Sequence, residues 1–131
     1  MEQKIEKISL NGLNIGQKYT IFQVETALGM PDEKQIRMDE HGLFYRFYYG
    51  NDIIHLNSET GINLFILRDK RFLINNHFQV GDSLSILLST PNCQFKFGKP
   101  GECDVYFSND KAPLRITITD NIITWIGFIL S

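Results

Sequence analysis

The chain has few of the residues from which the most easily recognised functional sites are built. Its 131 residues include two cysteines, three histidines, four prolines and a single tryptophan. The histidines (His41, His55 and His77) have no spacing that brings two of them together, whereas a zinc site needs Cys and His ligands in local pairs. The glycines form no phosphate-cradling loop. We therefore expect no metal site, no cofactor and no catalytic residues.

Excess positive charge and long apolar runs are also missing. Thirteen basic residues face fifteen acidic ones, giving a net charge of −2, so the excess of Lys and Arg that draws in a phosphate backbone is absent and we expect no nucleic-acid partner. No apolar run reaches the roughly 18 residues of a membrane-spanning helix, and the opening MEQKIEKISLNG has no signal-peptide core. We expect no membrane span and a cytoplasmic location, or a periplasmic one if a signal was trimmed.

The two cysteines are expected to lie on a hairpin that turns at residues 98–101. A four-residue turn there pairs Lys96 with Cys103 and places Cys93 opposite Tyr106. Cys93 is then about three residue rises, or roughly 10 Å, from the position opposite Cys103. A disulfide needs Cα atoms about 4.4–6.8 Å apart. We therefore predict two reduced thiols, which suit the cytoplasm.

Two short helices and nine strands are expected along the chain. Thr20 and Gln23 form a capping box at the start of a helix that ends at Gly29, and a leucine stripe within residues 82–91 indicates the second helix. Alternating polarity, with turn residues such as those at 108–110 between segments, predicts the strands. They are residues 35–38, 43–49, 53–57, 62–67, 71–75, 93–97, 102–107, 114–119 and 122–129.

The same order of elements occurs twice: a glycine, a helix, a proline and a run of antiparallel strands. Within it, YYGND at 48–52 corresponds to YFSND at 106–110. An internal repeat changes the expected fold. We predict a single α+β domain over residues 1–131, made of two tandem helix-plus-antiparallel-strand repeats at about 14–75 and 80–131. Their helices are expected to pack on one face of the sheet.

A short helix that leaves through Gly29-Met30-Pro31 into antiparallel strands resembles the β-lactamase-inhibitor-protein fold. The small outer-membrane-assembly lipoproteins carry one such unit. The resemblance extends from about residue 14 onward, and it implies this tandem fold and a role in binding or inhibiting another protein. The chain has no lipobox cysteine and no match to the inhibitory residues of that family, so no site residue is carried over.

The segment 43–50, LFYRFYYG, has five aromatic residues among eight. Because alternate side chains of a strand face opposite ways, we expect the odd-numbered ones to face the helices and the even-numbered ones to face outward. Residues 62, 64 and 66, like 114, 116 and 118, are expected on the inner face, whereas the side of Trp125 is left open by the pattern. The predicted partner-binding residues are Phe44, Arg46, Tyr48, Phe65, Asp104, Tyr106, Arg115 and Trp125.

These interpretations predict a non-catalytic protein-binding module of the inhibitor or toxin-immunity type, whose partner is a protein such as a toxin or an enzyme. Tyr, Trp and Arg are enriched at the centres of protein interfaces, which favours this reading. Two alternatives stay open. One is an envelope-assembly or periplasmic module, and the other is a small-ligand-binding protein or enzyme with a pocket between helices and sheet. The sequence does not determine the oligomeric state.

Overall fold

The structure is a computed structural model, and it describes residues 8–40, 42–107 and 112–130. Helix α1 (Ile21–Leu28) begins at the expected capping box, in which Thr20 Oγ1 accepts from Gln23 N and Gln23 Oε1 accepts from Thr20 N. It ends at Gly29, whose φ of +89° is costly for a residue with a side chain. Both helix boundaries expected from the sequence are confirmed.

Helix α2 (Leu84–Leu88) is a single short turn capped by the hydroxyl of Ser83. Near the N-terminus, β1 (Ser9–Leu10) and β2 (Leu13–Asn14) pair as a small two-stranded sheet. Neither helix is long enough to be stable without packing on the sheet. Among the described residues, no helix is long and apolar enough to cross a membrane.

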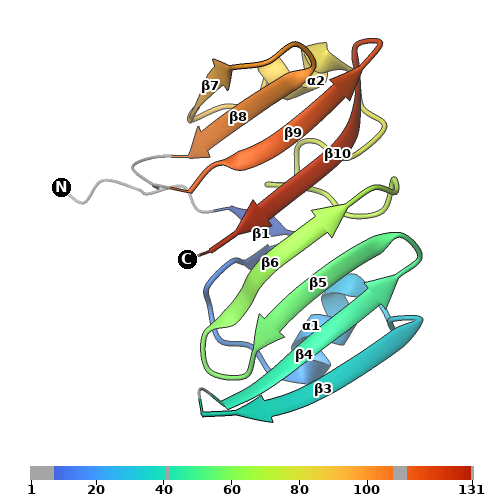
Figure 1. Cartoon of the computed structure of the whole chain (residues 1–131), viewed down its shortest axis with the longest axis vertical. Helices are drawn as coiled ribbons and strands as arrows, with labels where there is room; N and C mark the ends of the chain where they lie inside the picture. Colours follow the sequence, from blue (N-terminus) through green and yellow to red (C-terminus); the bar gives the residue numbers. More distant parts are fainter. Residues whose placement is uncertain (1–7, 41, 108–111, 131) are drawn as a thin grey trace, which may run out of the picture.

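Eight strands form one antiparallel sheet in the order β3-β4-β5-β6-β10-β9-β8-β7 (Figure 1). Each neighbouring pair is a hairpin except β6 and β10, which are far apart in sequence and pair directly at the centre. The bounds are β3 (Glu33–Asp39), β4 (Gly42–Tyr49), β5 (Asp52–Asn57), β6 (Gly61–Leu67), β7 (Cys93–Phe97), β8 (Glu102–Phe107), β9 (Leu114–Thr119) and β10 (Ile122–Ile129).

The expected α+β class with two tandem helix-on-sheet repeats is wrong. Of the described residues 51% lie in strands and only 11% in helices, and a single continuous eight-stranded sheet carries the fold. The prediction treated the two helices as a main layer of the fold, although they contain only eight and five residues. It also assigned the strands to two units, whereas pairing of β6 with β10 merges them into one mostly β architecture.

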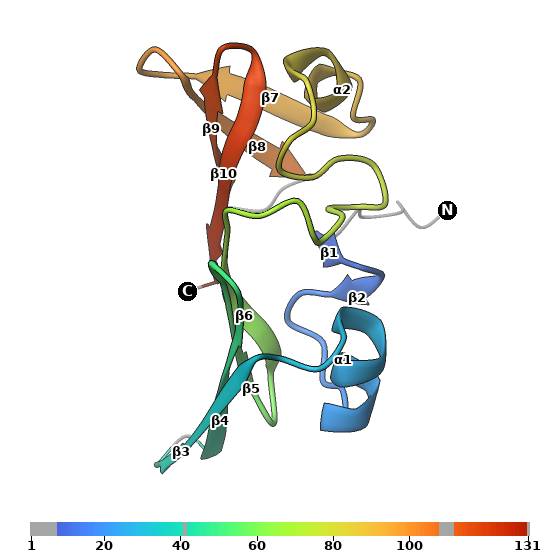
Figure 2. The ribbon, with the colours of Figure 1, turned by 90° about the vertical axis from the view of Figure 1, so that its right-hand side faces the viewer.

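All other elements lie on one side of this sheet (Figure 2). That side holds the hydrophobic core, to which every strand from β4 to β10 except β7 contributes fully buried side chains. The helices also contribute to this core, through Val24 and Leu28 of α1 and Leu87 of α2. The two helices therefore cover the ends of one sheet face, and the opposite face carries neither of them.

Three local predictions need correction or fall outside the description. Residues 71–75 are not a strand; only Ile74 makes isolated bridges there, to Leu10 and Phe78. The β7–β8 hairpin is shifted by one residue, so that Cys93 faces Phe107 and not Tyr106. The turn expected at 108–110 lies outside the described residues.

The one-residue shift in the register of the β7–β8 hairpin does not change the prediction of reduced thiols, because both cysteines are free. Phe97 now pairs with Cys103, so the two cysteines are four residue rises apart, about 13 Å. Burial is the largest cause that raises the pKa of both thiols, and Cys103 is fully buried in the core.

Candidate functional site

The candidate site is the sheet face that looks away from both helices, which we call the open face. Figure 1 looks onto it, and Figure 2 shows it in profile, with β3 and the β7–β8 turn projecting beyond the central strands. The pairing registers identify its members. They include Phe44, Arg46, Tyr48, Ile53, His55, Leu64, Ile66, Asp104, Tyr106, Arg115, Thr117, Trp125, Gly127 and Ile129.

One row of side chains crosses most of the open face. Going from β4 to β8, each residue is the direct register partner of the next. Tyr48 and Arg115 lie four strand spacings apart in this row, about 19 Å. The row therefore brings the predicted partner-binding residues of β4 into line with those of β8 and β9, which are far away in the sequence. It consists of Tyr48, Ile53, Ile66, Gly127, Arg115 and Asp104.

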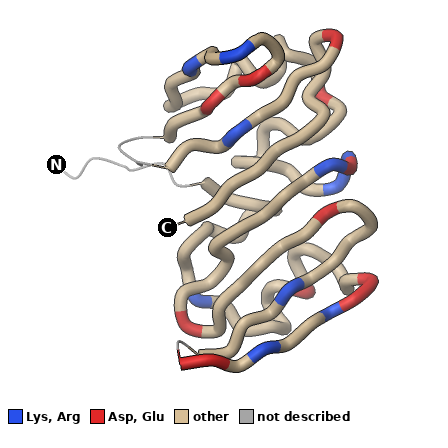
Figure 3. The backbone as a smooth tube through the Cα atoms, viewed as in Figure 1, with Lys and Arg blue, Asp and Glu red and all other residues tan. Residues whose placement is uncertain are grey.

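The centre of the open face is apolar. Strands β6 and β10 contain no charged residue, and in Figure 3 they form an uncharged band with Lys, Arg, Asp and Glu on the strands and turns around it. Leu64 and Ile66 are half-buried in this band, and Ile129 is 63% exposed. Apolar side chains left uncovered over several strands are typical of a contact surface.

Two β-bulges determine which side chains reach the open face. Asn63 is an extra residue in β6, between Ile62 paired with Leu56 and Leu64 paired with His55. Such a bulge reverses the alternation of every following residue. The predictions that Leu64 and Ile66 face the helices and that Phe65 faces outward are therefore wrong.

Phe65 lies in the core and is 0% exposed, stacked on Phe128 with ring centroids 5.7 Å apart. It cannot touch a partner without unfolding of the sheet. The other seven predicted residues all lie on the open face, although Phe44, Arg46 and Tyr48 sit on β4 and the remaining four on strands β8 to β10.

A second bulge, at Thr124, settles the side of Trp125. Ile123 pairs with Ile118 on the core side, and Trp125 pairs with Thr117 on the open face. The indole folds over Gly127, where a Cβ atom would lie 2.2 Å from a ring carbon. Gly127 thus allows the indole to lie flat on the sheet, half-buried, beside a shallow hollow of about 440 Å³ that Leu64, Ile66 and Ile129 help to line.

Replacing Gly127 by alanine is expected to lift the indole off the sheet, since the new methyl group occupies the position of the ring. Trp125 is the only tryptophan, so the emission maximum should shift to the red as the ring enters water. Gly98→Ala is the matched control, because a Cβ there meets nothing within 4 Å. An unchanged Gly127→Ala spectrum would contradict the placement of the indole.

Arg46 places a positive charge on the β4 end of the open face. Its Nη1 donates to the Tyr48 hydroxyl over 3.3 Å, so this hydrogen bond joins the guanidinium to a neutral group. Burial, followed by the nearby Arg46 guanidinium, lowers the pKa of His55, which therefore stays neutral at pH 7. Arg46, His55 and Phe44 help to line a hollow of about 390 Å³.

At the other end of the row, Arg115 and Asp104 form a loose ion pair, with Nε and Oδ1 3.9 Å apart. The Arg115 side chain is 73% exposed, so this pair contributes little to stability. Tyr106 lies further along β8, opposite Gln94 of the edge strand. Each end of the apolar band is thus bordered by an arginine and a tyrosine.

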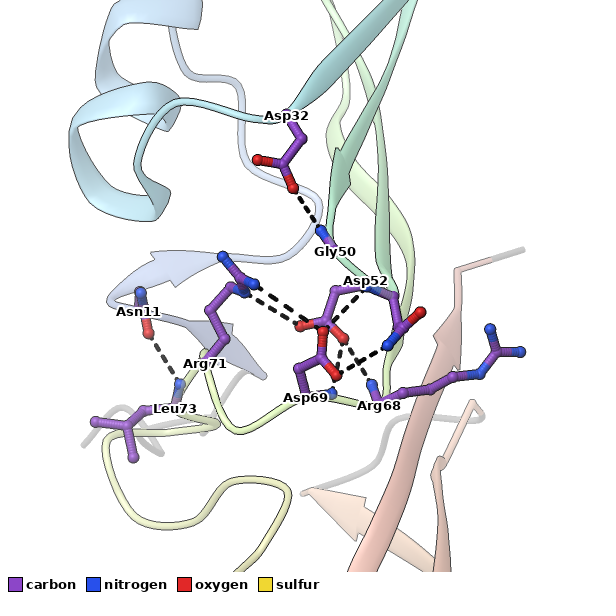
Figure 4. Close-up of polar contacts among 9 residues, drawn as sticks. Asn11, Asp32, Gly50, Asp52, Arg68, Asp69, Arg71 and Leu73 are labelled. Atoms are coloured by element: carbon purple, nitrogen blue, oxygen red, sulfur yellow. Dashed lines mark hydrogen bonds and ion pairs between the residues drawn. The ribbon is translucent and has the colours of Figure 1, made fainter.

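A buried polar cluster lies away from the open face, where the β4–β5 hairpin meets the chain leaving β6 (Figure 4). Asp52 is fully buried, and its Oδ1 accepts from the backbone N–H groups of Arg68 and Asp69 at 2.7 and 3.0 Å. Its Oδ2 has no hydrogen-bond partner among the described residues; Arg71 Nε lies 3.9 Å away.

Burial is the largest cause that raises the pKa of Asp52, against the lowering effect of the two N–H groups. A carboxyl group with a shifted pKa often marks a catalytic site. The hydrogen bonds of Asp52, however, hold the chain that leaves β6. Burial likewise raises the pKa of Tyr49, whose hydroxyl donates to Gly29 O over 2.8 Å. No group of three or more His, Cys, Asp or Glu suited to a metal occurs in the described part of the chain.

Sequence reasoning missed the apolar centre of the open face. Ile53, Leu64, Ile66 and Ile129 were assigned to the core or given no role. Ile53 could have been found, because it alternates with the core residues Ile54 and Leu56. The others could not, since their side depends on the bulges.

Comparison with protein-family models, curated proteins and solved structures gave no match for this chain. The resemblance drawn from Gly29-Met30-Pro31 therefore stays a prediction.

Proposed function

We propose that this protein is a non-catalytic binding module that recognises another folded protein through its open face. The observation that carries the proposal is the uncovered apolar band over β6 and β10, bordered at each end by an arginine and a tyrosine. Interfaces with an apolar centre and a polar rim have this arrangement, with Trp, Tyr and Arg supplying most of the binding energy.

Trp125 and Tyr48 are the expected anchors. Both rings are half-buried on the sheet, so little conformational freedom remains for them to lose on binding. The hollow beside Trp125 suits an apolar side chain of the partner. Arg46 suits a carboxylate, because its hydrogen bond to the uncharged Tyr48 hydroxyl leaves the charge of the guanidinium unneutralised.

The role that suits such a face is masking a toxin or an enzyme, as an inhibitor or immunity protein does. We place this activity in the cytoplasm. The free Cys93 and Cys103 support a reducing compartment, because disulfides form and persist mainly in oxidising ones.

The test is capture of the partner from a lysate of the native cells, with the purified chain as bait and identification by mass spectrometry. Once a partner is identified, its affinity is measured for Tyr48→Ala, for Trp125→Ala and for Phe97→Ala. The last is the matched control, since Phe97 is 56% exposed and lies on the helix side of the edge strand β7.

We expect each anchor variant to weaken binding at least about 30-fold, equivalent to about 2 kcal/mol, and the control to bind like the wild type. Circular dichroism should show an unchanged fold in all three. Full affinity in a folded Tyr48→Ala, Trp125→Ala double variant would contradict the assignment of the open face.

A further inference from the structure

The outer edge of β3 is the longer of the two free edges of the sheet. β3 is the terminal strand, and no other strand in the described part of the chain pairs with its outer side. It has seven residues, against five for β7 at the opposite edge. Alternate residues of such a strand direct their backbone N–H and C=O groups away from the sheet, where another strand can bind.

The helix-facing side chains of β3 are not covered by the helix. Ile36 and Met38 pair with Tyr45 and Leu43 of β4, so they lie on the core side of the sheet, yet they are 59% and 77% exposed. In Figure 2, β3 diverges from α1, which stays over the inner strands. The core side of the sheet therefore ends in an apolar strip that α1 does not cover.

Helix α1 adds a third apolar side chain beside this strip. Glu25 Oε1 binds Lys34 Nζ at 2.7 Å, which fixes that flank of α1 next to β3. Phe22 lies one helical turn before Glu25 on the same flank, and its ring is 79% exposed. Exposed apolar side chains therefore occur both on β3, at Ile36 and Met38, and on the flank of α1 that carries Glu25, at Phe22.

We propose that this edge binds β3 of a second copy of the chain in antiparallel register, with the two-fold axis passing at Arg37, so that two eight-stranded sheets become one. In this register Ile36 lies opposite Met38 of the second copy. Lys34 lies opposite Glu40 of the second copy. Each pair occurs twice. The Ile36–Met38 pair lies on the helix side, where these apolar side chains are exposed, and Glu40 is the first residue beyond β3.

The exposed apolar side chains of β3 select this register over its neighbours, because only an axis at Arg37 sets Ile36 opposite Met38 in both halves of the pairing. An axis at Ile36 sets Glu33 opposite Asp39, and like charges directly opposite are destabilising. An axis at Gln35 sets Glu33 opposite Arg37, which is favourable, but it sets Lys34 opposite Ile36 and leaves Met38 beyond the paired segment. An axis at Met38 sets Arg37 opposite Asp39, but it sets Ile36 opposite Glu40.

The axis at Arg37 has one unfavourable contact, Arg37 with its own copy on the open-face side. Asp39 of each copy is the diagonal neighbour of that arginine, within reach of its long side chain. The single like-charge contact is therefore offset within the same interface.

The register is tested by cysteine cross-linking under oxidised glutathione. Arg37→Cys places the two thiols directly opposite each other, where Cα atoms are about 4.5–5.5 Å apart and within disulfide range. Gln35→Cys is the control, because the two copies of residue 35 are about 13 Å apart in this register. We expect a disulfide-linked dimer for Arg37→Cys on a non-reducing gel, and only the background of the wild type for Gln35→Cys.

Sedimentation equilibrium tests the association itself. The wild type should approach twice its 15.2 kDa chain mass as concentration rises, and Ile36→Lys should remain at the single-chain mass. Ile129→Lys is the matched control, since Ile129 is 63% exposed but lies on the open face. It should associate like the wild type while weakening partner capture, so the two surfaces are tested separately.

Three results would overturn the proposal. One is a wild type that keeps the single-chain mass up to millimolar concentration. Another is equal cross-linking of Arg37→Cys and Gln35→Cys. The third is a dimer that Ile36→Lys does not weaken.

Discussion

Phe65→Ala is expected to lower the free energy of unfolding by about 3–5 kcal/mol, the usual cost of removing a buried aromatic ring. The ring is completely buried and stacks on Phe128, and its strand is paired on both sides at the centre of the sheet. A cavity there cannot collapse easily, because Phe65 lies between Ile54 and Phe128 in register.

Phe44→Ala is the matched control. Phe44 is a half-buried phenylalanine of the open face, so its removal should cost about 1 kcal/mol, typical of a substitution that opens no core cavity. Urea unfolding measures both, with the midpoint reporting stability while the slope stays constant. If Phe44→Ala were the more destabilising variant, the bulge at Asn63 and the facing of β6 would be wrong.

Asp52→Ala is expected to cost about 2–3 kcal/mol, because it leaves the backbone N–H groups of Arg68 and Asp69 without their acceptor. Asp52→Asn keeps an oxygen at the Oδ1 position and should cost less than about 1 kcal/mol. Comparing the two variants separates the contribution of the hydrogen bonds to stability from that of the charge. Urea unfolding at pH 7 measures the free energy of unfolding of each variant. Equal losses in the two variants would show that the charge of Asp52, and not its acceptor oxygen, holds the loop.

The raised pKa of Asp52 predicts that the difference in stability between the wild type and Asp52→Asn depends on pH, with a defined sign. The pKa of Asp52 is raised in the folded state, chiefly by burial, so above its ordinary value near 3.8 the folded chain holds more protons than the unfolded one. Stability then falls as the pH rises through this window, until the carboxyl is ionised in both states. Asp52→Asn lacks this titration.

The measurable quantity is the difference in unfolding free energy between the wild type and Asp52→Asn at a series of pH values from 3.5 to 7. It should decline as the pH increases, since all other titrating groups are shared by the two proteins. A difference that is flat or rises with pH would contradict the cause assigned to the shift, which is the cost of ionising a buried carboxyl.

The outward facing of Phe44, Arg46 and Tyr48 could be predicted from the sequence. β4 is regular over its whole length, so alternation alone places its side chains. The same holds for Arg115 on β9. The turn between β9 and β10 agrees with this alternation, because Asp120 and Asn121 have φ of +52° and +62°, the positive values that a type I′ two-residue hairpin loop needs and that Asp and Asn tolerate.

Local chemistry in the sequence determined the helix caps, the bounds of all eight strands of the large sheet to within two residues and the absence of a disulfide. Each of these depends on residues that are close along the chain. Only the tertiary structure decided that β6 pairs with β10, that Asn63 and Thr124 are bulged, and hence that Phe65 is buried while Trp125 and Ile66 reach the open face. The physical reason is that strand register is set by distant partners, and one inserted residue reverses every side chain that follows it.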